Sequence, residues 1–190
     1  YMPSKDWEFN LGLVYSQTSD FPRFDRLYRK QDGVLRAAEW YYGPQKWFLG
    51  NLKINHRSRS EFYDKVQFTG AYQYFGESRN DRNFGEPILF STEENVDAYS
   101  ANLDFEKSLS ESKLFYGFEY VLNSVASEGA FRNIQNGETG DTASRYPDDS
   151  KWQSMAVYSS YQWKISEDLS LQSGLRYNHI LVDAKFEDRF

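Results

Sequence analysis

Side chains of alternating character recur along the chain with a period of two residues, and this pattern limits the fold more than any other feature. In the first such segment large apolar residues occupy every second position: Trp7, Phe9, Leu11, Leu13 and Tyr15. The residues between them are mostly polar or small: Glu8, Asn10, Gly12, Val14 and Ser16. Successive side chains of a β-strand point to opposite faces of its sheet. The segment therefore predicts a strand with one hydrophobic and one polar face.

The alternation returns six more times, which predicts an all-β, antiparallel fold with about seven long strands. The hydrophobic positions of these segments begin near Phe48, Val66, Tyr99, Leu114, Met155 and Leu169. Most segments reach the roughly 9–11 residues that a tilted strand needs to cross a bilayer. The connections alternate between short and long, as in outer-membrane barrels with tight periplasmic turns and long external loops. We expect short turns near 56–65, 108–113 and 166–168, and long polar loops at 21–45, 76–95 and 124–151.

The hydropathy of the chain fits a transmembrane β-barrel. Mean hydropathy is −0.78, and no apolar run approaches the roughly 18 residues expected of a membrane-spanning helix. In a barrel only alternate residues face lipid, so the average stays polar. Aromatic residues make up 18% of the chain and gather near strand ends, as in interfacial girdles, at Trp7, Tyr15, Trp47, Tyr74, Trp152 and Trp163. The alternative is a soluble β-sandwich, which also alternates apolar and polar residues but usually has shorter strands.

Composition and motifs argue against catalysis and against several classes of ligand. The chain has no Cys, which excludes disulfides, thiolate metal sites and Cys nucleophiles, and its net charge of −6 disfavours nucleic acid. His56 and His179 fall on hydrophobic positions near strand ends, which suits an interfacial imidazole better than a haem or metal ligand. His179 has no suitable nucleophile beside it on its strand, since its neighbours on the same face are Tyr177 and Leu181, and we expect no enzyme and no cofactor. The spacing of three acidic residues matches no calcium-binding loop and indicates a solvated acidic loop, at Asp141, Asp148 and Asp149.

The region 21–45 is the candidate ligand-binding loop because it combines basic and aromatic residues. Its charged residues are Arg23, Arg26, Arg29, Lys30 and Arg36, against Asp25, Asp32 and Glu39, and an aromatic run follows at Trp40, Tyr41 and Tyr42. Guanidinium groups beside aromatic rings can hold an anionic, partly apolar ligand. The alternative is that the aromatics anchor a strand at the outer membrane interface, while the arginines pair with lipopolysaccharide phosphates or with neighbouring carboxylates.

Several motifs resemble the TonB-dependent outer-membrane receptors, and most closely the haem or haemoglobin receptor branch of Bacteroidetes-like bacteria. The motifs are Phe21-Pro22-Arg23-Phe24-Asp25-Arg26-Leu27, Trp40-Tyr41-Tyr42-Gly43-Pro44-Gln45, Glu77-Ser78-Arg79 with Arg82, and Gly174-Leu175-Arg176-Tyr177-Asn178-His179. Phe24 departs from the pattern, in which Tyr is more usual. The resemblance adds Arg79 and Arg82 to the candidate ligand-binding residues, alongside Arg23, Asp25, Arg26, Trp40, Tyr41 and Tyr42.

The resemblance also implies the larger assembly. Residues 1–190 are expected to be part of a receptor barrel of 22 strands, with the remaining strands and an N-terminal plug domain outside this sequence. The implied function is import of an iron chelate, haem or siderophore, powered by the TonB–ExbB–ExbD complex. The implied location is the outer membrane, with lipid and lipopolysaccharide around the barrel. The alternatives are a non-transporting structural or adhesive barrel and a soluble carbohydrate-binding β-sandwich.

Within such a barrel the polar face of the strands turns toward the lumen and the plug. Its candidate residues are Glu8, Asn10, Asn51, Lys53, Gln67, Gln73, Asn102, Asp104, Glu106, Glu119 and Arg176. A buried polar face needs hydrogen-bond partners, and a plug would supply them.

Overall fold

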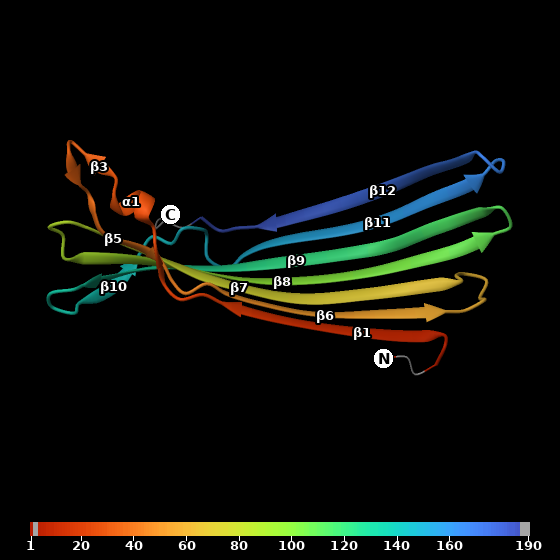
Figure 1. The fold of residues 1–190 in the computed structure, drawn as a ribbon, viewed down its shortest axis with the longest axis horizontal. Helices are drawn as coiled ribbons and strands as arrows, with labels where there is room; N and C mark the ends of the chain where they lie inside the picture. Colours follow the sequence, from red (N-terminus) through yellow and green to blue (C-terminus); the bar gives the residue numbers. More distant parts are fainter. Residues whose placement is uncertain (2–3, 187–190) are drawn as a thin grey trace.

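The computed structural model describes residues 1 and 4–186, and its main element is one long antiparallel sheet. Seven long strands lie side by side in the order β1-β6-β7-β8-β9-β11-β12 (Figure 1). Their bounds are Trp7–Gln17 (β1), Lys46–Arg57 (β6), Lys65–Asn83 (β7), Ile88–Leu109 (β8), Ser112–Asn133 (β9), Ser150–Lys164 (β11) and Ser170–Asp183 (β12). The predicted all-β antiparallel fold with seven long strands is confirmed. The sheet is open, so closure and a size of 22 strands stay predictions.

Short elements gather at one end of the sheet, which we call the loop end (Figure 1). They are β2 (Phe21–Pro22), α1 (Phe24–Leu27), β3 (Lys30–Gln31), β4 (Val34–Leu35), β5 (Ala37–Tyr42) and β10 (Thr139–Thr142). The region 21–45 is therefore not an irregular loop, because β5 pairs with both β2 and β7. The opposite end, which we call the turn end, carries the connections 58–64, 110–111 and 165–169. No helix in the described part of the chain is long and apolar enough to cross a membrane.

The prediction of long polar loops at 76–95 and 124–151 is wrong. β7 continues to Asn83 and β8 begins at Ile88, so only 84–87 connect them, with Gly85 in a left-handed conformation at φ 79°. β9 likewise continues to Asn133 and pairs there with β10. β8 and β9 each have 22 residues, about twice the length that a bilayer requires. Their extensions carry polar residues on both faces, so they lack the alternation that marks the rest of the strands.

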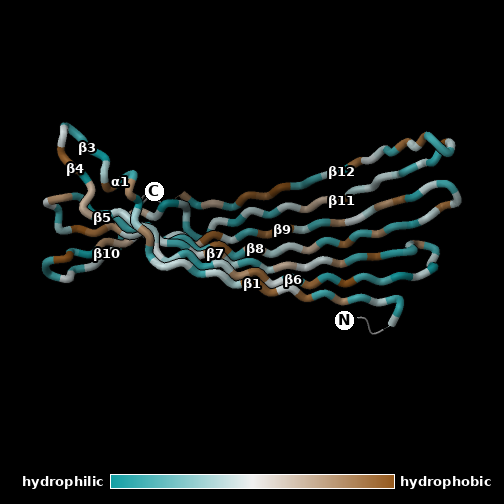
Figure 2. The backbone as a smooth tube through the Cα atoms, in the orientation of Figure 1, coloured by the Kyte–Doolittle hydropathy of each residue, from teal (hydrophilic) through white to brown (hydrophobic). Residues whose placement is uncertain are grey.

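Outside the extensions, the register keeps the hydrophobic and polar faces separate across the seven long strands. In Figure 2 hydrophilic and hydrophobic stretches recur along each of them. On one face Leu11 lies opposite Leu52, and Leu103 lies opposite Phe118. On the other face Asn102 lies opposite Glu119. Leu11 of β1, Phe118 of β9 and Val157 of β11 are 72%, 42% and 53% exposed, so no part of the described protein covers the hydrophobic face over these strands. A single sheet with one uncovered apolar face suits lipid contact, not the two packed layers of a sandwich.

Aromatic rings form a continuous band on the hydrophobic face near the turn end. The rings of Trp7 and His56 stack with centroids 4.1 Å apart, and His56 Nδ1 lies 3.0 Å from the hydroxyl of Tyr63. Tyr63 lies 5.8 Å from Phe105, which stacks on Tyr116 at 4.9 Å. Such bands of amphipathic rings mark the level of a membrane–water interface. His56 is one ring in this band, in agreement with the interfacial interpretation of the sequence.

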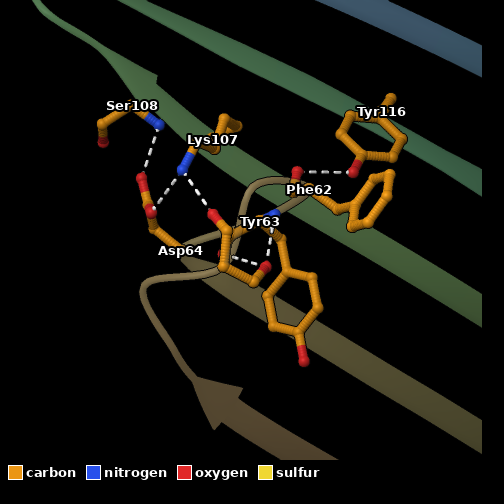
Figure 3. Close-up of polar contacts among 7 residues, drawn as sticks. Phe62, Tyr63, Asp64, Lys107, Ser108 and Tyr116 are labelled. Atoms are coloured by element: carbon orange, nitrogen blue, oxygen red, sulfur yellow. Dashed lines mark hydrogen bonds and ion pairs between the residues drawn. The ribbon is translucent and has the colours of Figure 1, made fainter.

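The connection 58–64 folds back over β8 and β9 and is held there by hydrogen bonds (Figure 3). The Asp64 carboxylate accepts bonds from Lys107 Nζ at 2.9 Å and from the Ser108 backbone N–H at 2.7 Å. Lys107 Nζ also donates to the Ser60 carbonyl at 2.7 Å, and the Tyr116 hydroxyl donates to the Phe62 carbonyl at 2.7 Å. The predicted short turn is therefore a fixed structure that ties three strands together at the turn end.

Acidification is expected to loosen this turn. The Ser108 N–H and the Lys107 ammonium hold the pKa of Asp64 below its usual range. The stabilising effect of the carboxylate is therefore complete above the unfolded-chain pKa of about 4 and is lost as the pH falls through the lower folded value. Hydrogen exchange at the Ser108 amide, corrected for its intrinsic rate, should accelerate over that window. Asp64→Asn should exchange fast already at pH 7, and Asp168→Asn at another turn should not.

Candidate functional site

Arg23 lies at the centre of a cluster of arginine and aromatic side chains at the loop end. Its guanidinium carbon lies 5.1 Å from the ring centroid of Trp40 and 5.5 Å from that of Tyr42. It donates to the Tyr42 hydroxyl at 2.8 Å and makes two bonds of 2.6 Å to the Asp25 carboxylate. Because of this ion pair the pKa of Asp25 is lowered and the pKa of Arg23 is raised. Arg23 is thus fully engaged within the protein.

Two further arginines complete this arginine–aromatic cluster. The Arg79 guanidinium, from β7, lies 5.1 Å from the Tyr42 ring, and that of Arg26 lies 6.0 Å from the Trp40 ring. Trp40 and Tyr42 point to the same face because they pair with Asp81 and Arg79 of β7. The structure therefore brings together six of the eight candidate ligand-binding residues: Arg23, Asp25, Arg26, Trp40, Tyr42 and Arg79.

Tyr41 and Arg82 do not join the cluster. Tyr41 lies opposite Asn80 and Arg82 lies opposite Glu39, so both belong to the other face of the same strands. Arg82 Nε binds the Glu39 carboxylate at 2.7 Å, and its Nη1 donates to the Glu86 carbonyl at 3.1 Å. A strand places neighbouring residues on opposite faces, so the run 40–42 could not act as one aromatic surface.

The cluster is occupied by its own contacts. Guanidinium groups already lie over the rings of Trp40 and Tyr42, and Asp25 already neutralises Arg23. A ligand that stacked on these rings would have to displace the arginines first. The arrangement therefore favours the alternative in which the arginines pair with neighbouring carboxylates, at least for Arg23.

An ionic network at the base of the loop end escaped the sequence interpretation. The Glu77 carboxylate accepts a bond from Gln45 Nε2 at 2.8 Å and lies 3.3 Å from Arg79 and 3.8 Å from Arg145. Its register partner Glu94 is only 4% exposed. Burial raises the pKa of Glu94, and a hydrogen bond with the Thr92 side chain opposes this shift. Within the described part of the chain Arg79 Nε has no hydrogen-bond partner. Buried polar atoms in this state are uncommon and call for a partner.

The segment 143–149 packs against β9 instead of extending into solvent. The Asp148 carboxylate accepts the Ser127 backbone N–H at 2.9 Å, and Ser127 Oγ accepts the Tyr146 N–H at 3.2 Å. Gly129 allows the approach, because a Cβ there would collide with the Ala143 carbonyl. Asp141, Asp148 and Asp149 nevertheless stay exposed to solvent, as predicted for an acidic loop, while Asp148 also anchors the segment to β9. Among the described residues, no group of three or more His, Cys, Asp or Glu side chains could hold a metal ion.

The polar face carries a second network, which spans β8, β9, β11 and β12. The Glu119 carboxylate accepts bonds from Asn102 Nδ2 at 3.1 Å and from Arg176 Nη2 at 2.5 Å. Tyr158 donates to the Asp104 carboxylate and lies 5.4 Å below the Arg176 guanidinium. The register places all eleven predicted lumen residues on this same face: Glu8, Asn10, Asn51, Lys53, Gln67, Gln73, Asn102, Asp104, Glu106, Glu119 and Arg176. Tyr158 was missed, although its polar-face position could be read from the alternation.

Comparison with known proteins identifies a solved structure with the same fold and a protein family. The copper transporter OprC, a solved structure, matches with a TM-score of 0.70 and 14% identity over 96% of this chain. The chain spans 27% of the length of OprC, so the shared feature is the fold of part of that protein. No curated protein matches the chain by sequence. A family model described as the outer membrane protein beta-barrel family matches residues 50–189. The chain belongs to this outer-membrane β-barrel family, and its location is the outer membrane.

Proposed function

We propose that the protein is a receptor that imports an iron chelate, either haem or a siderophore, across the outer membrane with energy from TonB–ExbB–ExbD. In this proposal the hydrophobic face contacts lipid, and the loop end lies outside the cell. The polar face turns toward a lumen that a plug domain fills. The motif resemblance to TonB-dependent receptors supports this proposal, as does the shared fold with a transporter.

The observation that carries the proposal is the polar face of the sheet. Charged and amide side chains follow it from β1 through β6, β7, β8 and β9 to β12. A plug that fills the lumen would supply hydrogen-bond partners for such a face. The polar face therefore supports a receptor with a plugged lumen.

Uptake by the full-length protein tests the proposal. The gene should be expressed in a Gram-negative host that lacks its own receptors, with the matching TonB–ExbB–ExbD complex. We expect energy-dependent accumulation of one member of a panel of radiolabelled haem, iron siderophores and copper. Collapse of the proton gradient should abolish accumulation while leaving binding to the cell surface intact.

The panel separates the candidate cargoes. Accumulation of copper alone would replace the iron-chelate assignment with the cargo named for OprC. A correctly inserted barrel that accumulates none of the compounds, with or without the proton gradient, would refute transport and favour the structural or adhesive alternative.

A further inference from the structure

A small pocket beside the arginine–aromatic cluster has a different character from the cluster itself. It has a volume of about 220 Å³ and lies where α1, β5 and β7 meet at the loop end. Three of its lining residues are arginines, and the others include Trp40 of β5 and Asp81 and Asn83 of β7. We call it the arginine pocket, after Arg26, Arg29 and Arg36.

The local chain path explains how the three arginines converge. α1 is a single helical turn, and the Arg29 N–H donates to the Arg26 carbonyl at 3.2 Å just after it. The chain then reverses through the short β3–β4 hairpin and returns at Arg36. The Arg36 carbonyl accepts the Phe84 N–H at 2.9 Å, which ties this position to the end of β7. Arg29 and Arg36 directly flank this hairpin and are thus brought to one pocket, beside Arg26 of α1.

The charges in the pocket do not balance. Asp81, which interacts electrostatically with Arg36, is the one carboxylate among the described lining residues, against three guanidinium groups. Within the described chain, neither Arg29 nor Arg36 forms an ion pair, and the Arg26 Nε lies 3.9 Å from an Asp25 oxygen that already binds Arg23. Arg23, by contrast, has a carboxylate of its own at 2.6 Å. Like charges held together repel one another, and an anion placed between them removes that repulsion.

We propose that the arginine pocket binds a small oxyanion, a carboxylate or a phosphate. Arg29 and Arg36 supply the charge-assisted hydrogen bonds. Trp40 lines the pocket without stacking on the ligand, because Arg23 and Arg26 already lie near its ring. The inference rests on the proposed import function and adds an anionic cargo to it. The pocket is smaller than the roughly 300–1,000 Å³ typical of sites for whole drug-sized ligands. It therefore holds one anionic arm of the cargo, while the rest of the cargo lies outside it.

Equilibrium binding to the full-length protein in detergent tests this inference. The probes are citrate and inorganic phosphate, measured by calorimetry at low salt. We expect Arg29→Gln/Arg36→Gln to weaken binding at least about tenfold. The matched control is Arg57→Gln/Arg59→Gln, which removes the same charge from exposed positions at the turn end and should leave binding unchanged. Migration of the folded barrel on unheated gels confirms that each variant has inserted.

The outcomes distinguish a carboxylate ligand from a phosphate ligand. They also distinguish failure of the anion-binding proposal from failure of the import proposal. Binding of citrate only assigns a carboxylate ligand, binding of phosphate only assigns a phosphate ligand, and binding of both assigns a general oxyanion site. Failure of both probes to bind, or equal affinity in the pocket variant and the wild type, overturns the inference. Binding needs neither TonB nor a proton gradient. Anion binding without uptake would therefore refute the import function and leave the pocket standing.

Discussion

Leu103→Arg is expected to destabilise the barrel in a bilayer by about 2–4 kcal/mol, the usual cost of a lipid-facing arginine near the midplane of a barrel. Leu103 lies on the hydrophobic face of β8, between Phe68 of β7 and Phe118 of β9. Rings therefore flank it on both neighbouring strands, and the described chain holds no layer above this face. An arginine there would meet hydrocarbon or would have to bend toward the interface.

The adjacent position provides the matched control. Asn102 points to the polar face, and its Nδ2 donates to the Glu119 carboxylate at 3.1 Å. Asn102→Arg places the same new charge beside Glu119 and leaves the hydrophobic face unchanged. We expect its effect to stay within about 1 kcal/mol, because the new ion pair offsets the lost amide bond.

Both variants of the full-length protein should be folded into phospholipid vesicles and unfolded reversibly with urea, so that their free energies of unfolding can be compared. Equal destabilisation by the two substitutions would mean that the faces have been assigned to the wrong environments. That result would contradict the lipid-facing assignment on which the location of the loop end and the import function depend.

Alternation of side chains was sufficient to predict the seven strands and their two faces. The reason is physical, because within the membrane each side chain faces either lipid or a polar interior. Hydrophobic and polar residues must therefore alternate in the sequence there. Beyond that zone the constraint ends. The extension of β8 opens with the short apolar run Ile88-Leu89-Phe90, of which Leu89 is buried, and continues with polar residues on both faces. A run of three residues is too short to show a period of two, so periodicity indicated a loop there.

The candidate site was predicted in part, for a similar reason. Arg23 and Trp40 were identified as an arginine beside an aromatic run, and they do meet. Arg23 pairs with Asp25, which neutralises its charge. This ion pair depends on side-chain geometry, which the spacing of residues in the sequence does not indicate. The unpaired pocket arginines Arg29 and Arg36 converge only because of the β3–β4 hairpin, which sequence reasoning did not foresee.

The Tyr158–Asp104 contact depends on a gap that a glycine leaves open. Gly117 lies between the two residues in the register, opposite Tyr158 on one side and Asp104 on the other. A Cβ added at Gly117 would lie 2.5 Å from the Tyr158 hydroxyl and 2.6 Å from the Leu103 carbonyl oxygen. The tyrosine thus reaches across a bare backbone to bind the strand beyond, an arrangement that aromatic residues often make over sheet glycines.

Gly117→Ala should therefore destabilise the barrel by about 1–3 kcal/mol, the range for overpacking, through displacement of Tyr158 and strain against the Leu103 backbone. Gly174→Ala is the control on the same face. The nearest atoms to its Cβ, the Ser159 carbonyl oxygen at 3.1 Å and Ser160 Cβ at 3.3 Å, need to move only slightly. In a double-mutant cycle with Tyr158→Ala, Gly117→Ala should cost less, because both the hydroxyl and the ring carbon Cζ, which would lie 2.6 Å from the added Cβ, are gone. If the free-energy costs in that cycle are additive, or if Gly174→Ala costs as much as Gly117→Ala, Gly117 is not what allows Tyr158 to reach Asp104.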